Sequence, residues 1–162
     1  MKSHSFLLLL SFLLFAAALF YYIFSKIKSP LNRRDDQVNG SKKKILVVDD
    51  DKGLLKMVRA SLINSGFDVV TAATGEKGIQ LAQTKDPDLI VLDVLLPGIK
   101  GREVCIRLKR DKKTRHIPVM FLTAKDSPDD VKAELEAGAV THLTKPVDPK
   151  ELISEIKKIL NL

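Results

Sequence analysis

Three short runs of apolar residues constrain the fold of this chain more than any other feature. They cover residues 45–48, 89–92 and 119–122, and every position in them is apolar. Strands buried on both faces of a parallel sheet have this pattern, whereas a strand with one solvated face alternates apolar and polar residues. Two further runs, at residues 67–71 and 140–143, are mixed and suit the edges of the same sheet. The sequence therefore predicts five parallel strands.

Helical patterns separate these strands. Apolar residues recur at helical spacing after each run, among them Val58 and Leu62, Val104 and Leu108, Val131 and Leu135, and Ile156. Ser127 and Asp148 each precede a proline, as a capping residue does before the first helical position, while Gly66 and Gly138 suit helix C-termini. The pattern predicts five βα units, and so an α/β domain.

The expected topology follows from which strands are buried. If strands one, three and four are interior and all crossovers are right-handed, the strand order is 2-1-3-4-5, with helices on both faces, as in flavodoxin-like folds. The direction of winding then reverses between strands one and three. Sheets of this kind bind ligands in that crevice, at the carboxyl ends of the strands.

Chemically active side chains follow four of the predicted strands. Asp49, Asp50 and Asp51 come after the first strand, and Asp93 comes after the third. Close carboxylates repel unless a cation joins them, and an all-oxygen ligand set favours Mg²⁺. The sequence therefore predicts a magnesium site at the carboxyl edge of the sheet.

A hydroxyl and an amine complete this edge: Thr123 follows the fourth strand and Lys145 the fifth. A metal can neutralise the oxygens of a phosphoryl donor, so that one carboxylate attacks phosphorus and becomes an aspartyl phosphate. Thr123 would then donate a hydrogen bond to the new oxygens and Lys145 would supply positive charge. Singly, each residue is an ordinary turn or cap residue, but together they indicate phosphoryl transfer.

Four segments resemble the receiver domain of two-component response regulators. They are Ile45–Asp50, Leu92–Gly101, Phe121–Ala124 and Leu143–Pro146. They occur in the family's order and at its usual spacing. The resemblance extends over about residues 43–162, and we predict a receiver domain at residues 44–162.

The resemblance implies a role for each residue at the carboxyl edge. Asp93 is the phosphoacceptor, and Mg²⁺ is held by Asp50, Asp93 and the backbone carbonyl of Leu95, with Asp49 acting through water. Thr123 matches the switch hydroxyl. Lys145 matches the lysine that pairs with the phosphoryl group, and its peptide bond to Pro146 is usually cis in the family. Asp51 matches no functional position, and we interpret it as a helix-start residue.

Two departures from the family pattern stand out. Receivers commonly carry Tyr or Phe three residues before the lysine, as the aromatic half of the switch, but this chain has His142. Imidazole is smaller and titrates near neutral pH, and we interpret His142 as an exposed side chain of an edge strand. The sequence also stops at Leu162, directly after the last predicted helix. We therefore expect a stand-alone receiver without an output domain.

An apolar segment precedes the predicted domain. Residues 5–25 contain no charged side chain, and 21 helical residues extend about 31 Å, enough to cross a hydrocarbon core of about 30 Å. We predict a membrane anchor at residues 1–25, in contact with lipid through residues 5–25, and a solvated basic linker at residues 26–43. The linker's positive charge predicts a single-pass protein of the cell membrane with its receiver on the cytoplasmic side. The alternative is a signal peptide cleaved after Ala16–Ala18.

The charge distribution argues against a nucleic-acid partner. The formal charge is +7, with six Lys/Arg and two Asp/Glu in residues 1–42 and 21 and 18 in residues 43–162. The domain is thus only weakly basic, whereas nucleic-acid binding usually needs a concentrated basic face.

A single cysteine excludes a disulfide framework and a Cys-rich zinc module, and Cys105 lies on a predicted apolar helix face.

These inferences give one main functional hypothesis and two alternatives. The main one is a membrane-tethered receiver that is not an enzyme, takes a phosphoryl group from a histidine kinase or phosphotransfer protein, and changes the surface it offers to a downstream protein. The first alternative is a receiver-fold binding module at the membrane that no longer needs phosphate, suggested by His142. The second is a phosphatase that works through an aspartyl intermediate.

Overall fold

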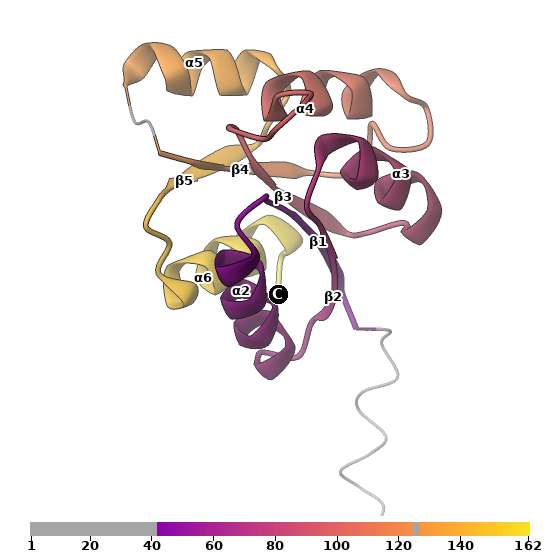
Figure 1. Ribbon diagram of the computed structural model, residues 1–162. Coiled ribbons are helices and arrows are strands. Elements are labelled where there is room, and N and C mark those ends of the chain that lie inside the picture. The colour runs from indigo at the N-terminus through magenta and orange to yellow at the C-terminus, as the bar shows by residue number, and fades with distance from the viewer. Residues whose placement is uncertain (1–41, 125–126) are drawn as a thin grey trace, which may run out of the picture. The chain divides into compact units, whose positions relative to one another are not determined.

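A five-stranded parallel sheet forms the centre of the domain in the computed structural model (Figure 1). Its strands lie in the order β2-β1-β3-β4-β5, as predicted from the buried runs. They are β1 (Lys44–Val48), β2 (Asp68–Ala72), β3 (Leu89–Asp93), β4 (Val119–Thr123) and β5 (Thr141–Thr144). The sheet edges are therefore the two strands whose sequences mix apolar and polar residues.

Five helices cover the two faces of this sheet. They are α2 (Lys52–Asn64), α3 (Gly75–Lys85), α4 (Gly101–Arg110), α5 (Pro128–Glu136) and α6 (Pro149–Leu160). Figure 1 shows α3, α4 and α5 on one face and α2 and α6 on the other. This arrangement confirms the predicted flavodoxin-like α/β fold.

The structure describes residues 42–124 and 127–162. The predicted anchor at residues 1–25, and all but the last two residues of the predicted linker at 26–43, lie outside these ranges. Within the described ranges, no helix has both the length and the apolar character that a membrane span requires.

Two apolar cores, one on each face, hold the helices to the sheet. All five residues of β3 and all five of β4 are buried, which explains why their sequences lack an alternating pattern. One core contains Cys105, whose thiol pKa rises to about 11 because the side chain is buried. The apolar helix face on which the sequence places Cys105 is thus part of the core.

The helix boundaries follow the predicted capping residues. The side chains of Ser127 and Asp148 accept hydrogen bonds from backbone N–H groups in the first turns of α5 and α6. Gly66 and Gly138 adopt φ angles of 92° and 99° just after α2 and α5, where a residue with a Cβ atom would be strained.

The structure corrects the predicted inner face of α5. Leu135 belongs to the apolar pattern that predicts this helix, but it is 50% exposed, whereas the preceding residue Glu134 is only 1% exposed. The helix is short and its apolar residues are few, so the hydrophobic pattern did not define its orientation. A carboxylate therefore faces the sheet at this position.

Candidate functional site

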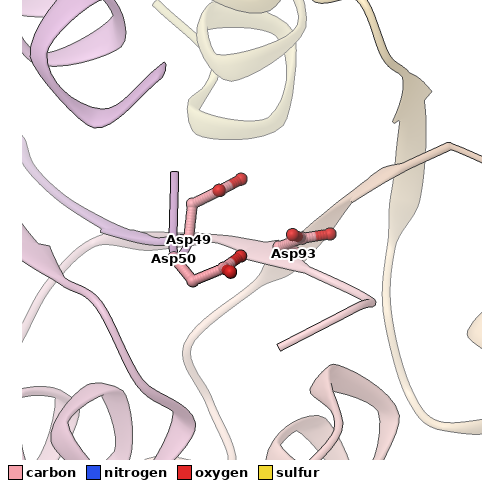
Figure 2. Close-up of side chains that lie close together, drawn as sticks. All are labelled: Asp49, Asp50 and Asp93. Atoms are coloured by element: carbon pink, nitrogen blue, oxygen red, sulfur yellow. The ribbon is translucent and has the colours of Figure 1, made fainter. Parts of the chain in front are cut away.

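Three carboxylates meet where β1 and β3 end. Val48 pairs with Leu92 in the sheet, so that Asp49 and Asp50 leave β1 at the level where Asp93 ends β3. One carboxylate oxygen from each residue lies within 4.8 Å of the others. Figure 2 shows the three side chains gathered at this edge. The predicted convergence of these residues is thus present in the structure.

The three carboxylates differ in exposure and in the groups that hold them. Asp49 is 0% exposed and Asp93 is 4% exposed, whereas Asp50 is open to solvent. Asp49 accepts a hydrogen bond from the N–H of Asp51 at 2.9 Å, and Asp93 accepts one from the N–H of Leu95 at 3.1 Å. The backbone N–H of Leu95 therefore lies beside the Asp93 carboxylate.

Asp51 does not share this site. Its Oδ1 accepts hydrogen bonds from the N–H groups of Gly53 and Leu54 and so caps α2. This confirms its interpretation as a helix-start residue.

Lys145 joins the two buried carboxylates. Its Nζ lies 2.7 Å from Asp49 Oδ2 and 2.9 Å from Asp93 Oδ2. The Lys145–Pro146 peptide bond is cis, and the N–H of Lys145 donates to the carbonyl of Thr123 at 2.7 Å. We call Asp49, Asp50, Asp93 and Lys145 the acid cluster.

Burial and charge pairing act in opposite directions within the acid cluster. Burial raises the pKa of the Asp49 carboxyl above its usual value, although the hydrogen bond from Lys145 works against this. Burial by itself would lower the pKa of Lys145, but hydrogen bonds to Asp49 and Asp93 outweigh it and raise that pKa. Lys145 is therefore held as a cation between the two carboxylates.

The acid cluster fits a divalent cation. The possible metal ligands are the oxygens of its three carboxylates, and one of these carboxylates is exposed, which gives an ion access from solvent. Mg²⁺ prefers oxygen ligands and is usually bound through one or two carboxylates while it keeps several waters. Asp49, Asp50 and Asp93 thus match the ligand chemistry expected from the sequence.

A second buried polar group lies beside β4 and β5, and we call it the switch cluster: Thr123, Glu134 and His142. Thr123 ends β4 and is 1% exposed. The side chain of His142 in β5 is only 27% exposed, and its Nδ1 lies 4.0 Å from Oε2 of Glu134 in α5. The interpretation of His142 as an exposed edge-strand residue is therefore wrong, because α5 covers its inner side.

Two residues of this region were missed by sequence analysis. Glu134 looked like an ordinary polar position of an amphipathic helix, and no spacing signal marks it. Gly101 was seen only as the end of a motif. A Cβ atom there would lie 2.0 Å from the carbonyl oxygen of Asp93, and the Gly101 N–H donates to the carbonyl of Val94 at 3.0 Å. The start of α4 thus packs directly on the backbone that carries Asp93.

The fold and the acid cluster define a class of protein: a doubly wound α/β domain with an acidic site, suited to a metal ion, at its topological switch point. The chain belongs to the response regulator receiver domain family, whose model matches residues 45–157. It is therefore a receiver domain of the two-component type. Receiver domains are phosphoacceptor signalling domains that bind Mg²⁺ at an acidic pocket, and the acid cluster is the corresponding group of carboxylates in this chain.

Curated relatives support this membership. The chain is 46% identical over 118 residues to the alkaline phosphatase synthesis transcriptional regulatory protein PhoP of Bacillus subtilis, covering 73% of this chain and 48% of PhoP. It is 40% identical over 116 residues to the response regulator PleD of Caulobacter vibrioides, covering 72% of this chain and 26% of PleD. The chain thus spans half or less of the length of these relatives.

Solved structures agree with the fold and the site. A CheY-like response regulator receiver domain protein of Methanospirillum hungatei has a TM-score of 0.70 and 30% identity, covering 75% of this chain and 95% of that one. The receiver domain of the sensor histidine kinase PA1611 of Pseudomonas aeruginosa has a TM-score of 0.70 and 25% identity, covering 75% and 100%. That structure has a magnesium ion coordinated in its active-site cleft.

Proposed function

We propose that this protein accepts a phosphoryl group on Asp93 from a histidine kinase or a histidine phosphotransfer protein. The observation that carries the proposal is the position of Asp93, which is almost buried, lies against two further carboxylates and is paired at 2.9 Å with Lys145. Asp49 also pairs with Lys145, but Asp49 is 0% exposed, whereas Asp93 is 4% exposed. Asp93 is the last residue of the central strand β3.

The transfer is a single displacement at phosphorus. An oxygen of Asp93 forms a bond to phosphorus while the P–N bond to the donor's histidine breaks, and the electron pair leaves with the imidazole nitrogen. Lys145 neutralises part of the charge on the phosphoryl oxygens. The Thr123 hydroxyl, which faces Glu134 in this structure, would turn to donate a hydrogen bond to one of those oxygens. Catalysis of this kind depends mostly on positioning and charge neutralisation.

Mg²⁺ belongs to the same site. Asp50, Asp93 and the backbone carbonyl of Leu95 would hold it, with Asp49 acting through water. Its chemical contribution is to neutralise phosphoryl oxygens. The protein's own part is to keep three carboxylate oxygens within 4.8 Å of one another, an arrangement that is costly without a cation.

The output of the domain is a change of its binding surface. Phosphorylation adds roughly −1.5 to −2 charges beside Thr123 and Lys145. The backbone hydrogen bond from Lys145 to Thr123 joins the ends of β4 and β5. The ends of these two strands would therefore move together when Asp93 is phosphorylated. The surface formed by α5 and β5 would then meet a downstream protein.

Labelling by a small phosphoryl donor tests this function. We expect intact-mass spectrometry to detect one phosphoryl group on the protein after incubation with acetyl phosphate and Mg²⁺. Asp93→Asn should abolish the label, and so should excess chelator. The matched control is Asp51→Asn, which changes a neighbouring aspartate to a residue that still caps α2 and should label normally. Unchanged labelling of Asp93→Asn would refute the assignment.

We further propose that residues 5–25 anchor the protein in the cell membrane, with the receiver on the cytoplasmic side. The support is the uncharged 21-residue segment and the basic residues that follow it. Membrane fractionation followed by protease treatment of sealed vesicles of both orientations tests this. A soluble product that begins near Leu19 would instead show a cleaved signal peptide.

A further inference from the structure

Glu134 is a buried carboxylate that the proposed phosphoryl transfer does not use. It is 1% exposed, and neither of its oxygens makes a hydrogen bond of normal geometry with the described residues. Burying a polar group without such partners is costly, and buried polar groups in native proteins are usually paired. A carboxylate in this position therefore calls for a physical explanation.

Groups from three other elements face Glu134. The Thr123 hydroxyl approaches it from the end of β4, the His142 imidazole lies 4.0 Å away on β5, and Arg102 approaches from α4. Asp130, on the same helix as Glu134, is the nearby negative group, and it binds Arg102 Nη2 at 2.7 Å. Much of the charge of Arg102 is thus compensated by Asp130, which leaves His142 as the main titratable partner of Glu134.

The proton affinity of Glu134 depends on these neighbours. Burial raises the pKa of the Glu134 carboxyl above its usual value, and Asp130 adds to this effect. The charge of His142 opposes it most strongly, followed by the Thr123 hydroxyl and Arg102. Any movement of Thr123 or His142 therefore changes how readily Glu134 binds a proton.

We propose that Glu134 and His142 form a proton-binding pair that couples the response of this receiver to pH. The proposal rests on the proposed function, because it concerns how phosphorylation of Asp93 is transmitted through Thr123. When the Thr123 hydroxyl turns toward a phosphoryl group on Asp93, Glu134 loses a neighbour that favours its ionised form. Glu134 then binds a proton more readily than it does before phosphorylation.

Glu134 is therefore protonated to a greater extent after phosphorylation than before, at the same pH. Coupling between two binding equilibria is reciprocal, so acidification must favour the arrangement that phosphorylation favours. The switch cluster would thus respond more fully to a given level of phosphorylation at lower pH.

Carboxyl NMR titration of the full chain tests the pair directly. With glutamate labelled at the carboxyl carbon, the Glu134 signal is assigned by its loss in Glu134→Gln. We expect it to titrate above the usual range for glutamate. His142→Phe should move its midpoint to still higher pH, and the midpoint should also rise when the wild-type protein is phosphorylated with acetyl phosphate and Mg²⁺.

Two controls accompany this titration. The signal of Glu136, an exposed residue of the same helix, should not respond to His142→Phe. His116→Phe removes an exposed histidine that lies 3.7 Å from Asp86, and it should leave the Glu134 midpoint unchanged.

The outcomes separate this inference from the proposed function. An equal Glu134 midpoint in the wild type and in His142→Phe would overturn the pair. A midpoint that moves with His142→Phe but not with phosphorylation would overturn the coupling. If Asp93 accepts no phosphoryl group, the proposed function fails, and the comparison of unphosphorylated wild type with His142→Phe still decides whether the pair exists.

Discussion

The acid cluster and the switch cluster each contain buried carboxylates, Asp49 and Asp93 in one and Glu134 in the other, yet these charges are compensated to different degrees. In the acid cluster, Lys145 lies within 2.9 Å of two carboxylates, and backbone N–H groups bind both of those carboxylates as well. In the switch cluster, the nearest histidine nitrogen is 4.0 Å from Glu134. One cluster is tightly paired and the other is loosely paired.

This difference indicates a division of labour. A network whose members are fully paired resists displacement, and a site that must hold a metal and a phosphoryl group needs fixed geometry. A loosely paired group gains little from its present position, so a small change nearby can move it or change its protonation. The tight pairing suits the chemistry, and the loose pairing suits the response.

The largest expected effect comes from moving the backbone that carries the acid cluster. In Gly101→Ala, the new Cβ would lie 2.0 Å from the carbonyl oxygen of Asp93, and backbone atoms cannot give way cheaply. We expect a loss of about 3 kcal/mol in the free energy of unfolding, measured by urea denaturation, together with slower labelling of Asp93.

Gly66→Ala is the control for Gly101→Ala. It has a φ of 92° but no atom within 4 Å of the new Cβ, so its conformational cost should be about 1 kcal/mol. If Gly101→Ala cost no more than Gly66→Ala, the backbone would not be fixed as described.

The second prediction removes the cation of the acid cluster. Lys145→Ala leaves Asp49 and Asp93 buried without their counter-ion, and we expect a loss of about 2 kcal/mol in the free energy of unfolding at pH 7.5 without Mg²⁺. The loss should shrink in an Asp93→Asn background, because one of the two facing charges is then absent.

Arg107→Ala offers a matched comparison for Lys145→Ala. Arg107 also lies 2.7 Å from a carboxylate, that of Glu103, but both side chains are about half exposed. Such surface pairs contribute less than about 1 kcal/mol. Equal losses for the two variants would show that burial does not strengthen the pairing at Lys145.

The third and smallest predicted effect concerns the switch cluster, where a substitution should increase the free energy of unfolding instead of lowering it. Because the pKa of Glu134 is raised in the folded protein, its ionisation destabilises the fold as pH rises from about 4.5 through the raised value. Glu134→Gln removes this penalty. We expect it to stabilise the domain by about 1 kcal/mol at pH 7.5 and by less at pH 5, measured by thermal unfolding at both pH values. Destabilisation at pH 7.5 would mean that the carboxylate is better paired than the structure indicates.

The sequence was sufficient to predict the sheet and the acid cluster, for a definable reason. Each buried strand is one apolar run, and Asp49, Asp50 and Asp93 stand directly after such runs, so the topology alone brings them together. Glu134 could not be found this way, because its contact with His142 depends on how α5 is rotated on the sheet. A helix of nine residues with few apolar side chains does not specify that rotation.

The position of β1 has a consequence for access to the protein. Lys44 begins this strand at the amino end of the parallel sheet, and Asp49 follows its last residue at the carboxyl end. Five strand residues extend about 17 Å. Lys44 and the reactive carboxylates therefore lie at opposite ends of the parallel strands. A donor protein that docks at Asp93 therefore contacts the end of the sheet remote from Lys44, the first residue of β1.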